Sequence, residues 1–251
     1  MKQTTAIVQA RMNSSRLPGK VMRSILGQPM LKLQLNRIRQ ANNLDLLVVA
    51  TTTQTQDESI ARLARKLNIL VFRGSQDNVL DRYYQAVQTY QAGTIIRLTA
   101  DCPLIDPQII DQAITIFRSK KYDFVTNTLV DTFPRGMDVE VFSSQTLQSI
   151  WRQATSPYDR EHVTTYVLSH PDKFHIYNLK ATAELKRPNL RLTVDEEPDF
   201  VLVKNIYKAL YRSDPSFSLR DIIKFLDKHP QLKQLNQDIR QKPILYRTSP
   251  K

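Results

Sequence analysis

Short apolar segments that alternate with amphipathic ones constrain the fold of this chain more than any other feature. In the first half of the sequence, five apolar runs are predicted strands: residues 4–10, 44–51, 69–72, 94–99 and 122–127. Four segments between them have the apolar period of a helix: residues 29–40, 56–67, 78–91 and 107–117. Strands that alternate with helices predict a mostly parallel sheet covered on both faces. The predicted fold class is therefore α/β, with a doubly wound, Rossmann-like architecture.

Two of the predicted helices have recognisable ends. Asp106 precedes the segment 107–117 and is a good N-cap, because its carboxylate can accept a hydrogen bond from an otherwise free amide of the first turn. Gly93 follows the segment 78–91 and is predicted as its C-terminal stop.

The alternation loosens in the second half of the chain. We interpret residues 133–190 as a small subdomain inserted into the sheet topology, with predicted strands at 139–142 and 174–179 and helices at 144–154 and 159–168. Three further elements are then predicted: a buried strand at 190–194 and helices at 198–211 and 219–229. One domain over residues 1–229 and a basic C-terminal tail over 230–251 follow from this pattern.

The charge of the chain indicates anionic partners without choosing among them. The net charge is +12 over 251 residues, which suits nucleic acid, anionic lipid or phosphorylated small molecules. The predicted tail contributes five of the cations, Lys233, Arg240, Lys242, Arg247 and Lys251, against one anion, Asp238. Basic residues interleaved with aromatic ones, as in many RNA-binding surfaces, are lacking, so nucleic acid is not the expected partner.

The expected compartment is the cytoplasm. The sequence contains no apolar run near the roughly 20 residues that span a bilayer, and its opening lacks the apolar core of a signal peptide. The single cysteine, Cys102, excludes an intrachain disulfide and fits a reducing compartment.

The loop after the first predicted strand is the strongest candidate for a phosphate site. Residues 9–20 place Arg11, Arg16 and Lys20 on a short loop rich in serine and asparagine, at the carboxyl end of a strand. The loop matches neither a Walker motif nor GxGxxG. Guanidinium groups bind two phosphate oxygens at once and an ammonium adds a mobile charge, so this loop, which we call the basic loop, suits a triphosphate.

Two carboxylates stand where predicted strands end. Asp101 follows the segment 94–99 and Asp195 follows the segment 190–194. Ligands of α/β sheets bind beyond the carboxyl ends of the strands, and Mg²⁺ commonly takes one or two carboxylates together with water and substrate phosphate. Asp101 and Asp195 are therefore the candidate metal ligands.

Four segments resemble one known family. QARMNSSRLPGKVM, FRGSQDNVLDRYY, RLTADCPLID and RLTVDEEPDF are similar to the cytidylyltransferases that make CMP-activated sugars. The likeness covers about residues 4–210 and is greatest to the CMP-Kdo synthetase type and, above all, the spore-coat-polysaccharide type. The sialic-acid branch usually has RGGSK where this chain has RMNSSR, so sialic-type substrates rank lower. The resemblance implies a nucleotide-diphospho-sugar transferase fold that binds CTP and Mg²⁺.

The resemblance also assigns roles to residues on the nucleotide side. Arg11, Lys20 and Asp101 are the implied catalytic residues, and Asp101 and Asp195 the implied ligands of Mg²⁺. The implied CTP contacts are Ala10, Arg11, Arg16, Lys20, Arg73, Asp77 and Asp101, with the segment 75–81 around the cytidine.

The acceptor side is implied by PRGMDVE and DREHVT, which resemble motifs of the spore-coat type. The implied sugar contacts are Arg135, Asp138, Glu140, Arg160 and His162. A subunit contact is an equally good interpretation of His162. Relatives often dimerise through the inserted subdomain, so a homodimer with Trp151 and Tyr158 as apolar anchors is a further expectation.

The predicted function is transfer of CMP from CTP to an acidic or phosphorylated sugar, with release of pyrophosphate, in the synthesis of surface polysaccharide precursors. Three alternatives stay open at this point. One is a nucleotidyltransferase or glycosyltransferase of the same fold that uses another nucleotide. The others are a nucleic-acid-binding protein and a binding protein without catalytic activity.

Overall fold

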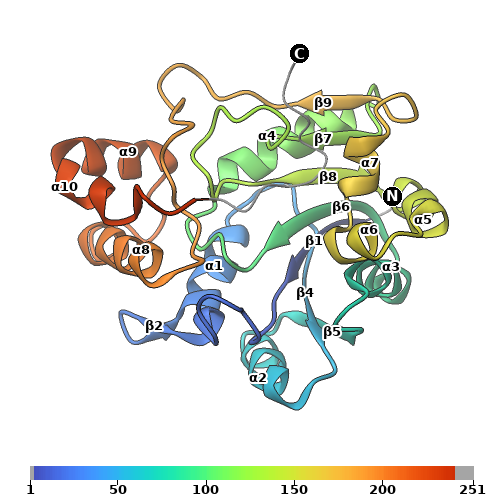
Figure 1. The fold of residues 1–251 in the computed structure, drawn as a ribbon, viewed down its shortest axis with the longest axis horizontal. Coiled ribbons are helices and arrows are strands. Elements are labelled where there is room, and N and C mark those ends of the chain that lie inside the picture. Colours follow the sequence, from blue (N-terminus) through green and yellow to red (C-terminus); the bar gives the residue numbers. More distant parts are fainter. Residues whose placement is uncertain (1–2, 241–251) are drawn as a thin grey trace.

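The structure is a computed structural model that describes residues 3–240, and its centre is one seven-stranded sheet (Figure 1). The strand order is β5-β4-β1-β6-β8-β7-β9. The strands are β1 (Gln3–Gln9), β4 (Leu46–Thr52), β5 (Leu70–Gly74), β6 (Ala92–Thr99), β7 (Phe124–Thr126), β8 (Glu140–Ser143) and β9 (Ile176–Asn178). β8 pairs antiparallel with both of its neighbours, whereas the other neighbouring strands pair parallel. The mostly parallel sheet that the sequence predicts is confirmed.

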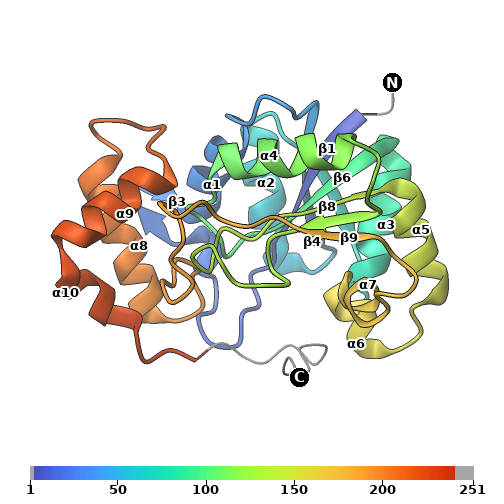
Figure 2. The ribbon, with the colours of Figure 1, turned by 90° about the horizontal axis from the view of Figure 1, so that it is seen from above.

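Helices cover both faces of this sheet (Figure 2). Alternate residues of β1 face two separate cores: Ala6 and Val8 belong to one, and Ile7 to the other. The first core lies against α1 (Met30–Ile38), α2 (Glu58–Lys66), α4 (Pro107–Arg118), α8 (Glu197–Leu210) and α9 (Leu219–Lys228). The second core lies against α3 (Val79–Tyr90), α5 (Ser144–Gln153) and α7 (Thr165–Ser169). A doubly wound arrangement is therefore present, as predicted.

The remaining elements are short. They are η1 (Lys20–Met22), β2 (Ser24–Ile25), β3 (Gln28–Pro29), η2 (Thr55–Asp57), α6 (Pro157–His162), α10 (Pro230–Lys233) and η3 (Gln234–Asn236). Asp106 caps α4 as predicted, because its Oδ1 accepts a hydrogen bond from the Gln108 amide at 2.8 Å. Its Oδ2 accepts a second bond from the Leu219 amide at 2.6 Å, which ties α9 to α4.

Two of the predicted element boundaries are wrong. Gly93 does not end α3: Gln91 makes that turn with a φ of 50°, and Gly93 lies inside β6. The predicted helix 159–168 is broken at Val163 into α6 and α7.

The predicted strand at residues 190–194 is also wrong. Leu192 and Val194 are buried, but β8 already occupies the place beside β6, so this segment packs against two loops instead. The Leu192 amide donates to the Arg135 carbonyl and the Val194 amide donates to the Asp101 carbonyl, both at 2.7 Å. We call residues 190–195 the acidic segment, since it ends in Asp195.

The stretch 133–190 does not build a sheet of its own. It supplies β8 and β9 to the central sheet and adds α5, α6 and α7. The subdomain boundaries therefore stay a prediction.

The start of the predicted tail is folded. α10 and η3 follow α9, and Asn236 is buried, with its side-chain amide donating to the Arg191 carbonyl at 3.1 Å. Lys233 forms an ion pair with Asp227 at 2.9 Å. The cations Lys242, Arg247 and Lys251 lie outside the described residues.

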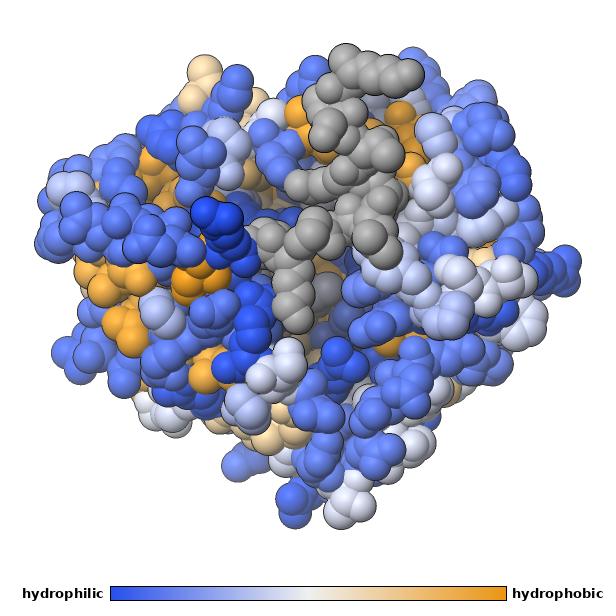
Figure 3. Space-filling model, in the orientation of Figure 1, coloured by the Kyte–Doolittle hydropathy of each residue, from blue (hydrophilic) through white to orange (hydrophobic). Residues whose placement is uncertain are grey.

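Most of the face in Figure 3 is hydrophilic, with apolar side chains gathered over α8. Within residues 3–240, the structure contains no helix that combines the length and the apolar character needed to cross a bilayer.

Gly136, in the loop before β8, packs closely against the acidic segment. We expect its replacement to destabilise the protein. Its φ is +103°, and a Cβ atom at this position would lie 2.6 Å from the Thr193 nitrogen. Gly136→Ala should lower the free energy of unfolding by roughly 2–4 kcal/mol, through backbone strain and steric overlap together. Urea unfolding measures the difference.

Gly27→Ala is the matched control. Gly27 has a φ of +76°, but a Cβ atom there would meet nothing within 4 Å. The control should cost about 1 kcal/mol, from strain alone. Equal losses in the two variants would contradict the close packing of Gly136 on the acidic segment.

Candidate active site

A cavity of about 540 Å³ lies beyond the carboxyl ends of β1 and β6. The basic loop and the acidic segment form one side, and the start of β8 together with α6 and the turn after it forms the other. Polar residues that line it include Gln9, Arg11, Arg16, Lys20, Arg97, Asp101, Thr128, Arg135, Asp138, Glu140, Tyr158, His162, Thr164, Thr165 and Asp195. The fold therefore brings together most of the residues that the sequence singles out.

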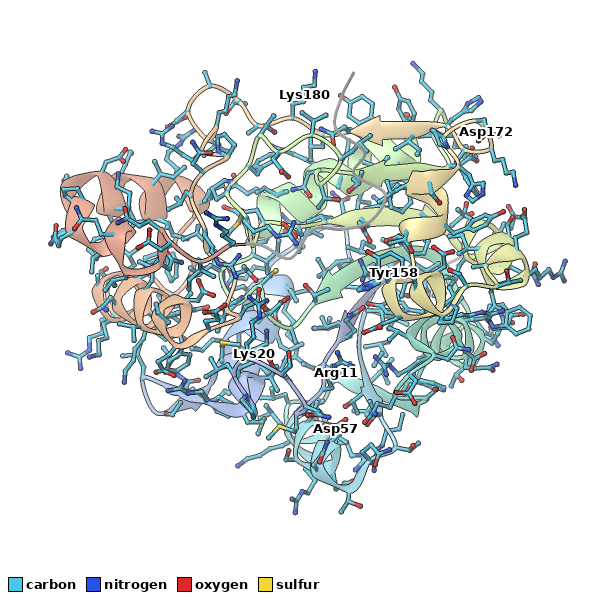
Figure 4. The ribbon with its side chains drawn as sticks, viewed as in Figure 1. Arg11, Lys20, Asp57, Tyr158, Asp172 and Lys180 are labelled. Atoms are coloured by element: carbon cyan, nitrogen blue, oxygen red, sulfur yellow. The ribbon has the colours of Figure 1, made fainter. Side chains whose placement is uncertain are left out.

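A buried carboxylate holds the basic loop in place. Asp57 Oδ1 accepts a hydrogen bond from the Met12 amide at 2.7 Å, and its Oδ2 accepts one from the Thr52 hydroxyl. The loop closes on itself where the Gly19 amide donates to the Met12 carbonyl at 2.8 Å, with Gly19 at a φ of 69°. Figure 4 shows Asp57 beside the loop that carries Arg11 and Lys20. Sequence reasoning missed Asp57, because it looked like an ordinary acidic residue of a first helical turn.

Lys20 lies between the two candidate metal ligands. Its Nζ donates to the Val194 carbonyl at 2.6 Å and to Asp195 Oδ1 at 2.9 Å, and it lies 3.9 Å from Asp101 Oδ2. The side chain of Lys20 is largely buried, whereas that of Asp101 is 30% exposed. The two carboxylates predicted to share a cation therefore share one in this structure, the ammonium of Lys20.

Asp195 has two further cationic partners. Arg16 Nη2 lies 2.9 Å and Arg191 Nη2 2.8 Å from Asp195 Oδ2. Burial alone raises the pKa of Asp195, but the attraction of Lys20 and of the two arginines outweighs it and lowers the pKa to about 2. Asp195 is therefore fully ionised at neutral pH.

Asp199 and Asn236 hold Arg191 in place. Its Nε donates to Asp199 Oδ1 at 2.9 Å, and the side-chain amide of Asn236 donates to the same oxygen at 2.8 Å. The contact between Asn236 and Asp199 could not be predicted from sequence, because only the fold brings these residues together.

Arg11 reaches across the cavity. Its Nη2 lies 4.0 Å from Glu161 Oε1 on α6, and both side chains are about half exposed, at 46% and 52%. Ala10 lines the cavity at the end of β1. Arg11 is thus the most accessible cation of the basic loop.

The structure does not bring Arg73 and Asp77 to this cavity. Arg73 donates to the carbonyls of Thr52 and Gln54, both at 2.9 Å, and forms an ion pair with Glu58. Asp77 is exposed and contacts its neighbour Gln76. Neither is among the described residues that line the cavity, and Arg73 instead holds the loop after β4 to the start of α2.

Four of the five predicted sugar contacts line the cavity, and Arg160 does not. Arg135 Nη1 lies 3.3 Å from Asp138 Oδ2. The ring of His162 packs on that of Tyr158, with 4.3 Å between their centres. Burial lowers the pKa of His162 below its ordinary value, so the ring is mainly neutral at pH 7.

Glu140 binds other residues of the cavity wall. Its carboxylate accepts a hydrogen bond from Arg97 Nη1 at 2.7 Å and others from the Thr164 hydroxyl at 3.0 and 3.1 Å. Sequence reasoning missed Arg97 and Thr164. A signal was present for Arg97, because a lone arginine interrupts the apolar run of β6.

The two predicted dimer anchors make contacts within the chain. Trp151 stacks on Tyr84, with ring centres 4.3 Å apart, and its Nε1 donates to Asp81 Oδ1 at 2.9 Å. Trp151 therefore joins α5 to α3, while Tyr158 lines the cavity from α6. The homodimer stays a prediction.

Comparison with known proteins identifies the family. A family model described as "Cytidylyltransferase" matches residues 5–246. The chain belongs to the cytidylyltransferase family. The spore coat polysaccharide biosynthesis protein SpsF of Bacillus subtilis is 35% identical, over 92% of this chain and 96% of that one. The cytidylyltransferase family is a family of enzymes, so the predicted enzyme class is confirmed.

Two solved structures agree with this result. A cytidylyltransferase from Leptospira borgpetersenii has a TM-score of 0.89 and 33% sequence identity, over 96% of this chain and 100% of that chain. A CMP:2-keto-3-deoxy-manno-octonic acid synthetase complexed with CTP has a TM-score of 0.63 at 18% identity, over 82% and 99% of the two chains. The second likeness shows a shared nucleotidyltransferase fold of the Rossmann-like class.

Asp57 should be essential for the shape of the basic loop. In Asp57→Ala, the Met12 amide and the buried Thr52 hydroxyl lose their acceptor, which should lower the free energy of unfolding by about 1–3 kcal/mol. Urea unfolding followed by circular dichroism measures this. Asp172→Ala, at an exposed position near the rim of the molecule (Figure 4), should stay within about 0.5 kcal/mol of the parent. Equal stabilities of the two variants would contradict the role of Asp57.

Proposed function

We propose that this cytidylyltransferase transfers CMP from CTP to a hydroxyl group of an acidic or phosphorylated sugar and releases pyrophosphate. One observation carries the proposal: three cations of the basic loop and two aspartates meet in one cavity, opposite a wall of polar side chains. The similarity to SpsF supports a sugar acceptor, and the shared fold with a synthetase complexed with CTP supports the donor.

The nucleotide side of the cavity is suited to a triphosphate. Lys20 and Arg16 are paired with Asp195 in this structure, and Arg11 is half exposed with one distant partner. Phosphate oxygens offer these cations the same kind of contact as the carboxylate does. We infer that the triphosphate takes over contacts of Arg16 and Lys20, while Arg11 turns inward to the phosphates.

Asp101 and Asp195 would hold Mg²⁺. Their oxygens flank one cationic atom, Lys20 Nζ, and two carboxylates completed by water and phosphate form the ligand set that Mg²⁺ prefers. Within residues 3–240 there is no group of three or more acidic, histidine or cysteine side chains that would form an all-protein metal cage. Bound there, the metal would supply positive charge at the α-phosphate.

The acceptor side is suited to a sugar with many hydroxyl groups. Arg97 is paired with Glu140 and Arg135 with Asp138, so charges of both signs line this wall, beside the hydroxyls of Thr128 and Tyr158. Such side chains donate to and accept from sugar hydroxyls, and either arginine offers further donors to an acidic group.

The reaction is a displacement at the α-phosphorus. The acceptor hydroxyl oxygen forms the new bond to phosphorus, its proton leaves, and the bond from phosphorus to the pyrophosphate oxygen breaks. Arg11, Arg16 and Lys20 stabilise the charge on the departing pyrophosphate. Positioning and charge neutralisation therefore account for most of the catalysis.

The choice of nucleotide is tested by thermal unfolding with CTP, UTP, GTP and ATP, each with and without Mg²⁺. A ligand at 100 times its Kd stabilises the native state by about 2.7 kcal/mol, so CTP with Mg²⁺ should raise Tm by several degrees. An equal response to all four nucleotides would favour another donor. Tight, salt-dependent binding to generic DNA, without a response to any nucleotide, would overturn the proposal.

Asp101→Asn should lower kcat at least about 100-fold, because it removes one of the two carboxylates that would hold Mg²⁺, whose positive charge would stabilise the transition state. Pyrophosphate release is measured with CTP, Mg²⁺ and four acceptors: 3-deoxy-manno-octulosonate, N-acetylneuraminate, glucose 1-phosphate and mannose 6-phosphate. Asp172→Asn, at an exposed position, is the control and should keep full activity. Near-normal turnover of Asp101→Asn at saturating Mg²⁺ would remove Asp101 from the catalytic residues.

A further inference from the structure

The backbone between α6 and α7 is strained at one residue. Val163 has φ and ψ of 62° and −59°, and the Thr164 amide donates to the His162 carbonyl at 2.7 Å, which closes a three-residue γ-turn. This conformation is rare, and a β-branched residue adopts it at a cost of about 1–3 kcal/mol. The side chain of Val163 is fully buried, so the surrounding core keeps the turn in place.

The turn changes which side chains face the cavity. Along a continuous helix, residues two apart point to nearly opposite sides. His162 and Thr164 are two apart, and both line the cavity, as does Thr165. The γ-turn thus places two polar side chains on one wall, which the unbroken helix predicted for residues 159–168 would separate.

Thr164 begins a chain of hydrogen bonds that ends at a guanidinium. Its hydroxyl donates to both carboxylate oxygens of Glu140, at 3.1 and 3.0 Å, and Glu140 accepts from Arg97 Nη1 at 2.7 Å. Arg97 and Glu140 are register partners on the antiparallel strands β6 and β8, so their side chains share one face of the sheet. All three residues line the cavity.

We propose that Thr164, placed by the strained turn at Val163, is a positioning residue that orients Glu140 and through it the Arg97 guanidinium, which binds an anionic oxygen of the acceptor. This inference rests on the proposed function. It explains how the cavity would bind an acidic or phosphorylated acceptor. A guanidinium with one edge fixed by a carboxylate presents its other donors in a defined direction. Without the Thr164 hydroxyl, Glu140 loses one of its two fixed partners.

The test compares Thr164→Val with Thr164→Ser. Valine has the shape of threonine but no hydroxyl, whereas serine keeps the hydroxyl. Thr164→Val should raise KM for the best acceptor of the four about tenfold, as expected for losing a hydrogen bond to a charged group. Thr164→Ser should stay within about twofold of the parent. The rise in Tm caused by CTP and Mg²⁺ should be the same in both variants, which also shows that both are folded.

A measurement without acceptor separates this inference from the proposed function. The Nη1–Hη signal of Arg97, the group that donates to Glu140, is identified by its loss in Arg97→Lys and followed by NMR in the enzyme alone. Its hydrogen exchange should be faster in Thr164→Val and unchanged in Thr164→Ser. If none of the four acceptors reacts, the proposed function fails, and the exchange rates still decide whether Thr164 positions Arg97. Unchanged exchange and unchanged KM in Thr164→Val would overturn the inference.

The four acceptors also distinguish the source of the anionic oxygen. Two of them carry a carboxylate and two carry a phosphate. A KM effect confined to one pair identifies the group that Arg97 binds. Equal effects on both pairs would show that Arg97 binds any anionic oxygen at this position.

Discussion

The rest of the site depends on the ion pairs that the Asp195 carboxylate forms with three cations. This carboxylate receives Lys20 and Arg16 from the basic loop and Arg191 from the acidic segment, at 2.9, 2.9 and 2.8 Å. Each of the three cations has one further carboxylate nearby, Asp101, Glu196 or Asp199, but only Asp195 contacts all three. In this partly buried place the repulsion among the cations is screened less than in water. Asp195 therefore lets the protein keep a concentrated positive charge in a folded cavity. A phosphate group can replace Asp195 as the partner of these cations, and no further cation has to move into the cavity.

The two sides of the cavity differ in how closely their cations are paired with carboxylates. Positive charge is in excess on the nucleotide side, where Arg11 is half exposed and its partner Glu161 is 4.0 Å away. On the acceptor side Arg97 and Arg135 each have a carboxylate partner within 3.3 Å. A half-exposed cation with a distant partner can turn to a highly charged ligand such as a triphosphate, whereas closely paired charges in a fixed geometry select among ligands by shape.

The sequence predicted those parts of the site that depend on one segment at a time. A strand followed by Asp101, or by Arg11 and Lys20, can be recognised locally, because the carboxyl end of a parallel strand is where ligands bind. The pair of Arg97 and Glu140 could not be predicted, since it depends on β8 entering the sheet antiparallel beside β6. Burial alone made residues 190–194 look like a strand, although loops cover them. The contacts of Arg73 with the carbonyls of Thr52 and Gln54 could not be predicted for a similar reason, since they are set by tertiary structure.

The two sides of the cavity come from different parts of the chain. The nucleotide side comes from the ends of the parallel strands β1 and β6 and from the acidic segment, whose backbone is tied to Asp101 at 2.7 Å. Most of the acceptor side comes from β8, α6 and the turn at Val163, which are separated from the basic loop by more than a hundred residues of chain. Changes in that second region can reshape one wall of the cavity while Lys20, Asp101 and Asp195 stay in place. Under the proposed function, one phosphate-transfer site could thus serve different acceptors, because the residues proposed to position phosphorus and those proposed to select the sugar lie on separate parts of the fold.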